Sequence, residues 1–130
     1  MEVKGPDDIE GVFQAAPRKH AQALMLGSGG FFASQQKRII ELATKSRLPT
    51  MYGNTRYVEA GGLMTYTNDR SENFRRVAEI VDKILKGIKP ADIPVERPKK
   101  FDFVINLKAA KQIGLTIPPE VLARASRIIR

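Results

Sequence analysis

Short apolar runs alternate along this chain with segments whose apolar residues recur at helical spacing, and this alternation constrains the fold most. The runs are Ala23–Leu26, Leu48–Tyr52 and Leu63–Tyr66, and each has strand length and a glycine at one end. Helical patterns precede and follow them. Strands that alternate with helices predict an α/β fold, with a mostly parallel sheet and helices on both faces.

The helical segments carry start and stop signals. Acidic residues suit a helix start, proline suits a first turn, and glycine is typical just after a helix end, as at Gly87. Asn106 is placed to cap a short helix. The predicted helices are one from Asp7-Asp8 to Pro17, Ser34–Ser46, the short turn Arg56–Ala60, Ser71–Lys86, Lys108–Ile113, and one that starts at Pro118-Pro119.

Apolar stripes are predicted along the helix from Asp7-Asp8 to Pro17, along Ser34–Ser46 and along two later helices, and one further strand follows a linker. Ile88–Pro98 holds three prolines and no helical period, which predicts an extended linker. Phe101–Leu107 alternates apolar and polar residues, which predicts a half-buried strand at a sheet edge. The stripes of the two later helices are Phe74, Val77, Ala78, Val81, Ile84 and Leu85 in Ser71–Lys86, and Val121, Leu122, Ala125, Ile128 and Ile129 in the last helix.

The charge of the chain raises the possibility of an anionic partner. Its 130 residues have the size of one domain and carry a formal net charge of +8. The basic residues are scattered in pairs such as Arg75-Arg76 and Lys99-Lys100, which favours solvated helix faces over a nucleic-acid footprint. A basic α/β module that binds nucleic acid or another anionic partner is therefore the alternative function.

The sequence gives little support for a catalytic site or a metal site. The chain has no cysteine and a single histidine, His20, which excludes a thiolate nucleophile and a multi-histidine metal site within one chain. Glu59 is a single carboxylate without a partner at the spacing that general acid–base catalysis needs. We therefore expect no enzyme activity, no catalytic residue, no metal and no cofactor.

Polar residues follow the predicted strands where an open α/β sheet places ligands. The loop Gly27–Gly30 offers backbone N–H groups to an anion, or is a flexible connection. Asn54 follows the second strand. Tyr52 and Tyr66 are expected at the same end of a parallel sheet, where they pack in the core or contact a ligand.

A resemblance covers nearly the whole chain. Three segments carry it: LATKSRLPTMYGNTRYVEAGG (42–62), VEAGGLMTY (58–66) and FRRVAEIVDKILKGIKPADIPVERPKKFDFVINLKAAKQIGLTIPPEVLARA (74–125). They resemble the C-terminal part of ABC-transporter substrate-binding proteins of the tryptophan/tyrosine type. This resemblance implies a type I periplasmic-binding fold, with residues 1–130 as one three-layer, Rossmann-like α/β lobe and 88–98 as a linker within it. Family members are more than twice this length, so we expect an N-terminal lobe to be missing.

The resemblance also implies a function. Similar proteins bind a small solute, often an aromatic or other amino acid, in a cleft between two lobes and deliver it to a membrane permease. By position, Ser28, Tyr52, Asn54, Glu59, Gly62 and Tyr66 would line the cleft.

Helix Ser71–Lys86 would leave this lobe to pack on the other one. Without that lobe, we expect the chain to form a homodimer through this helix. The family implies a periplasmic location. The chain as written has no signal-peptide apolar region, which predicts a cytoplasmic location instead.

Overall fold

The computed structural model describes Val3 and residues 5–130, and within them the strands form one sheet in the order β1-β2-β3-β4-β5. β1, β2 and β3 run parallel, β4 runs antiparallel to β3, and β5 runs parallel to β4. The predicted α/β fold with a mostly parallel sheet is confirmed. The strands are β1 Leu24–Leu26, β2 Thr50–Tyr52, β3 Met64–Asn68, β4 Phe101–Asn106 and β5 Arg127–Ile129.

Helices connect the strands largely as predicted. The predicted helix Ser34–Ser46 corresponds to α3, and a separate short helix that was not predicted, α2, precedes it and ends at Ser34. Asn106 caps α6 as expected, because its side-chain oxygen accepts a hydrogen bond from the backbone N–H of Ala109. The helices are α1 Asp8–Arg18, α2 Gly30–Ser34, α3 Gln36–Lys45, α4 Thr55–Glu59, α5 Arg70–Leu85, the 3₁₀ turn η1 Pro90–Asp92, α6 Leu107–Gln112 and α7 Pro119–Leu122.

Two apolar clusters hold the sheet between helices. Side chains alternate along a strand, and Tyr52 of β2 faces a cluster formed mainly by α1 and α3. Ile105 of β4 faces the other way, into a cluster with α6 and the segment around Ile117. The first cluster contains Ile9, Phe13, Ala16, Ile39, Ile40, Ala43, Leu48 and Tyr57 besides Tyr52, and the second contains Leu63, Ala109 and Ala110 besides Ile105 and Ile117.

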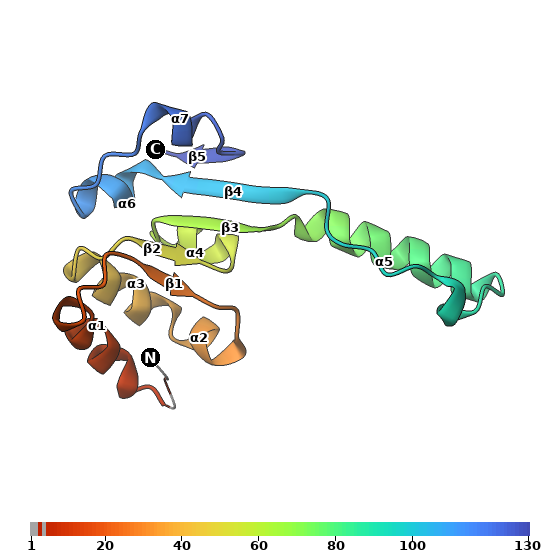
Figure 1. The fold of residues 1–130 in the computed structure, drawn as a ribbon, viewed down its shortest axis with the longest axis horizontal. Coiled ribbons are helices and arrows are strands. Elements are labelled where there is room, and N and C mark those ends of the chain that lie inside the picture. The colour runs from red at the N-terminus through yellow and green to blue at the C-terminus, as the bar shows by residue number, and fades with distance from the viewer. Residues whose placement is uncertain (1–2, 4) are drawn as a thin grey trace.

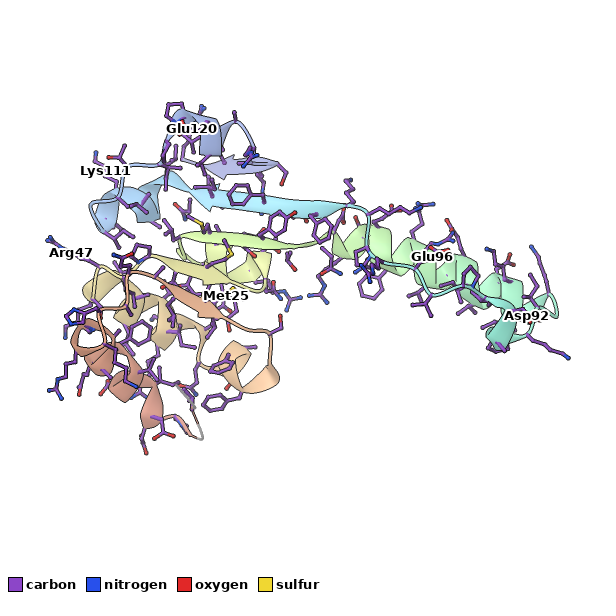
Figure 2. The ribbon with its side chains drawn as sticks, viewed as in Figure 1. Met25, Arg47, Asp92, Glu96, Lys111 and Glu120 are labelled. Carbon is purple, nitrogen blue, oxygen red and sulfur yellow. The ribbon has the colours of Figure 1, made fainter. Side chains whose placement is uncertain are left out.

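The first strand is less buried than its composition suggests. Met25 in the middle of β1 is 80% exposed, and Figure 2 labels it on this strand. β1 lies at the edge of the sheet and pairs only with β2 among the described strands. A continuous apolar run such as this one is typical of a strand buried on both faces, and the structure contradicts that interpretation, because Met25 is exposed on one face of β1.

The segment from α5 to the start of β4 projects away from the sheet (Figure 1). We call α5 and the returning residues 86–100 the arm, and the remaining described residues the sheet region. No residue of α5 is buried, and Val77, for example, is 56% exposed. The stripe predicted to be buried in Ser71–Lys86 is therefore uncovered in this chain, while Ile88–Pro98 runs back beside α5 as an extended linker apart from η1.

The C-terminus differs from the prediction. The last helix, α7, ends at Leu122, and Arg127–Ile129 pairs with β4 as the strand β5. β4 consequently lies between β3 and β5, so its predicted place at a sheet edge is wrong. Strand pairing with β4 satisfies the backbone groups of Arg127–Ile129, and this long-range pairing outweighs their helical spacing.

Candidate functional site

The carboxyl ends of β1, β2 and β3 lie side by side, because these strands are parallel and adjacent. Open α/β sheets bind ligands at such an edge. A hollow of about 470 Å³ lies here, within the size range of small-molecule sites. We call it the strand-end hollow, and its lining residues are Ser28, Gly53, Asn54, Thr55, Thr67, Asn68, Asp69, Arg70, Ser71, Asn73 and Asp102.

The loops after β1 and β2 approach each other closely at one side of the hollow. The Ser28 hydroxyl donates a hydrogen bond to the carbonyl oxygen of Gly53 at 3.4 Å. A Cβ atom at Gly53 would lie 2.7 Å from the Ser28 Oγ atom, so a larger residue there would displace the Ser28 side chain. Asn54 caps α4, since its Oδ1 atom accepts from the backbone N–H of Arg56 at 2.9 Å.

The opposite side is the base of the arm, where the chain leaves and re-enters the sheet region. The backbone N–H of Asp69 donates to the carbonyl oxygen of Lys100 at 3.0 Å, and Asp69 Oδ2 lies 3.1 Å from Lys100 Nζ. Asp69 Oδ1 also accepts from the backbone N–H groups of Ser71 and Glu72 and from the Ser71 hydroxyl. These bonds, first the one from the Ser71 hydroxyl and then the one from Lys100, hold the pKa of Asp69 well below its ordinary value.

The six residues implied by the resemblance do not all reach the hollow. Ser28 and Asn54 line it. Tyr52 is only 2% exposed, and its ring stacks on that of Tyr57 with 4.9 Å between the centroids. Burial raises the pKa of Tyr52 to about 12. Gly62 supports this packing, because a Cβ atom there would lie 2.7 Å from the Tyr52 ring.

Glu59 and Tyr66 also lie outside the lining of the hollow. Glu59 Oε1 accepts from the Arg127 guanidinium at 2.7 Å. Tyr66 is 54% exposed and stacks on Phe101, with 5.3 Å between ring centroids. Tyr52 and Tyr66 lie at the same end of the parallel strands, as expected, but on opposite faces of the sheet, because Tyr52 pairs in register with Thr65. A contact of any of the six residues with a solute stays a prediction.

Several lining residues were not singled out from the sequence. Thr67 and Arg70 flank Asn68 and Asp69, whose turn and cap character was the available signal. Asp102 reaches the hollow because β4 is antiparallel to β3 and pairs Asp102 with Thr67. No local pattern specifies that register.

A second hollow, of about 630 Å³, lies along the arm between α5 and the return segment. Its lining mixes apolar residues such as Val77 and Ile84 with ion-paired residues such as Arg76 and Glu96. Figure 2 shows Glu96 on the return segment beside α5 and Asp92 near the far end of the arm. Since no strand ends converge here, we treat this hollow as part of the uncovered surface of the arm.

Within Val3 and residues 5–130, no cluster of three or more His, Asp or Glu side chains has the arrangement of a metal site. The same residues contain no helix that is long and apolar enough to cross a membrane.

Comparison with known proteins identifies the family. Residues 1–129 match the sequence family described as ABC transporter substrate binding protein. The chain therefore belongs to this family, whose members bind substrates and are not enzymes. Among curated proteins, no match to the chain was found.

Solved structures agree with this assignment. A conserved domain protein from Vibrio cholerae O1 biovar El Tor is 31% identical with a TM-score of 0.81, over 97% of this chain and 42% of that chain. The ABC domain from Streptococcus pneumonia in complex with L-Trp is 29% identical with a TM-score of 0.84, over 99% of this chain and 43% of that chain.

A third structure supports the fold alone. The ligand-free, open substrate-binding protein CD0873 from Clostridium difficile, which has adhesive properties, is 18% identical with a TM-score of 0.70 and is matched over 98% of this chain and 42% of its own. The chain thus spans less than half the length of each of these three relatives.

Proposed function

We propose that this chain provides one wall of the solute-binding cleft of an ABC uptake system, and that its solute is an amino acid, with an aromatic one as the first candidate. The strand-end hollow carries the proposal, because polar groups converge there at the carboxyl ends of three parallel strands. The L-Trp bound to the similar Streptococcus domain supports the choice of solute.

This chain provides only one wall of the proposed cleft. The hollow is open, and more than half of the length of the relatives has no counterpart here. A solute against a single wall keeps much of its surface in water, whereas binding pockets normally bury most of it. We therefore expect the 130 residues alone to bind an amino acid weakly, on the order of millimolar. In the complete system, delivery to a permease at the outer side of the cytoplasmic membrane follows from the family.

An NMR titration tests this proposal. On addition of L-Trp to the ¹⁵N-labelled chain, the amide signals of Ser28, Asn54 and Thr67 should move in a saturable way. Glycine and indole are titrated separately, because they represent the main-chain part and the ring of L-Trp. Shifts confined to residues 74–98 of the arm, or no shifts up to the solubility limit of L-Trp, would contradict the proposed site.

We further propose that the chain produced alone forms a homodimer through α5. The apolar stripe of this helix is exposed, with Phe74 at 67%, Val77 at 56% and Val81 at 48%. Contiguous exposed apolar surface of this kind drives association. Sedimentation velocity should show a concentration-dependent dimer.

Charged substitutions locate the contact. The double variant Val77→Glu and Val81→Glu should be monomeric at concentrations where the parent chain is dimeric, because burying the added carboxylates is costly. The matched control adds the same charge at the exposed residues Gln14 and Gln22 of the sheet region. A monomeric parent chain, or equal effects of both double variants, would argue against contact through α5.

A further inference from the structure

The lining of the strand-end hollow contains no apolar or aromatic side chain that could pack on an aromatic ring. Every lining residue except Gly53 carries a polar or charged side chain. Aromatic solutes are held by apolar and aromatic side chains, with a few polar groups that fix their orientation. In this chain only the second requirement is met at the strand ends, which suits the polar end of a solute.

Not all of the polar lining is available to a ligand. The carboxylate of Asp69 is occupied by Ser71, Glu72 and Lys100, which together supply its hydrogen bonds and its counter-charge. Asn54 is engaged as the cap of α4, and the Ser28 hydroxyl donates to Gly53. These groups shape the hollow, and they are largely satisfied without a solute.

Two lining residues of opposite charge have side chains that are not engaged in ion pairs or hydrogen bonds among the described residues. Among Val3 and residues 5–130, the side chains of Arg70 and Asp102 form no salt bridge or hydrogen bond. Arg70 contacts only the ring of Phe74, with its guanidinium carbon 6.0 Å from the centroid. Lys100 exerts an electrostatic attraction on Asp102, but its ammonium group is bonded to Asp69.

The two residues come from the two places where the chain crosses between sheet region and arm. Arg70 opens α5 directly after β3, and Asp102 lies near the start of β4, opposite Thr67 of β3. The side chains of Thr55 and Asn73 add neutral hydrogen-bonding groups to the same lining. A positive and a negative group therefore flank a neutral polar surface in one hollow.

We propose that Arg70 and Asp102 recognise the charged main-chain groups of an α-amino acid, Arg70 binding the carboxylate and Asp102 the ammonium. An α-amino acid carries both charges on groups attached to one carbon, and both would form charge-assisted hydrogen bonds here. This assignment rests on the proposed function and makes it more specific. The strand-end hollow then selects for the zwitterion and is indifferent to the solute's side chain, which has to be held by a surface outside this hollow.

The experiment compares ligands that lack one charge. Dissociation constants for L-Trp, tryptamine and indole-3-propionate are measured by NMR titration with the parent chain, Arg70→Gln and Asp102→Asn. Each variant should bind L-Trp about tenfold or more weakly, as expected for loss of one hydrogen bond to a charged group. Arg70→Gln should leave the affinity for tryptamine unchanged, since tryptamine has no carboxylate. Asp102→Asn should leave that for indole-3-propionate unchanged, since it has no ammonium group.

A matched control and the alternative outcomes keep the test decisive. Arg97→Gln and Asp92→Asn remove the same charges on the arm, away from this hollow, and should bind L-Trp like the parent chain. If L-Trp binds at the hollow but Arg70→Gln and Asp102→Asn bind it equally well, the assignment of the charged groups is overturned while the proposed function stands. If the parent chain does not bind L-Trp at the hollow, both proposals fail. ¹⁵N spectra of each variant verify that it is folded.

Discussion

Helices α3 and α5 have similar amphipathic sequences, but the apolar stripe is buried in α3 and exposed in α5. In α3 the apolar stripe is covered, with Ile39 only 1% and Ile40 8% exposed. In α5 no residue is buried, and Val77 of its stripe is 56% exposed. The comparison shows that apolar periodicity specifies which face of a helix can be buried. The surface that buries this face lies elsewhere in the chain or outside it.

The two regions therefore depend on different interactions. The sheet region is held by burial of apolar side chains in two clusters. The arm is held by local contacts: Asp69 caps α5, Gly87 follows it with a φ of 97°, and the ion pairs are Arg75 with Glu72 and Glu79, Arg76 with Glu79 and Glu96, and Lys86 with Asp82. Such exposed ion pairs contribute little each.

The largest expected effect comes from truncating a side chain in the covered stripe. Ile39→Ala should lower the free energy of unfolding by about 2–5 kcal/mol, because it removes buried methylene groups and leaves a cavity. At a concentration where the chain is monomeric, Val81→Ala in α5 should change it by less than about 0.5 kcal/mol, because that side chain is 48% exposed and belongs to neither apolar cluster. Urea denaturation followed by circular dichroism measures both values. Similar losses in the two variants at that concentration would show that α5 is covered within a single copy of the chain.

A smaller difference is expected between two asparagines. Asn106 is buried, and it donates to the carbonyl oxygen of Val58 at 3.2 Å and accepts from the N–H of Ala109 at 3.0 Å. Asn106→Ala should cost about 1–3 kcal/mol, because two buried backbone groups lose their partner. Asn73→Ala in α5 should be neutral within about 0.5 kcal/mol. Thermal unfolding of the two variants measures the difference, and a neutral Asn106→Ala would mean that water replaces its bonds.

The success of sequence-based prediction follows the same division between local and long-range causes. Capping at Asn106 and the helix end at Gly87 depend on neighbouring residues, and both predictions are confirmed. The first three strands were also located, because each is an apolar run beside a glycine. By contrast, α2 was missed because five residues that begin with glycine show no helical period.

The errors concern pairing between distant segments. Ile128 and Ile129 fit a helical stripe, but pairing with β4 makes them a strand. That strand moves β4 into the interior of the sheet, and the antiparallel register of β4 brings Asp102 to the strand-end hollow. Of the candidate site, the loops were therefore predictable, whereas the charged residues required knowledge of the sheet order.

The smallest expected effect is a pH dependence confined to the base of the arm. The pKa of Asp69 lies below its ordinary value of 3.8, chiefly because the folded chain donates hydrogen bonds to its carboxylate from Ser71 and Lys100. A lowered folded-state pKa means that the ionised group stabilises its surroundings above the unfolded-state pKa, and that this stabilisation is lost as the pH falls toward the folded-state pKa. The first turn of α5 should therefore keep its stability as the pH falls to about 4 and become less stable below that pH.

The side-chain carboxyl ¹³C signal of Asp69 reports the titration directly, and the amide signals of Ser71 and Glu72 report the loss of the cap. Glu72 also has a lowered pKa, first because of its hydrogen bond from Arg75, so the Asp69→Asn variant is needed to separate the two groups. In that variant the amide signal of Ser71 should lose its pH dependence. The unfolding of the sheet region should not change, since no residue of α5 is buried. A midpoint at the ordinary value of 3.8 for Asp69 would show that the arm is already detached from its cap in solution.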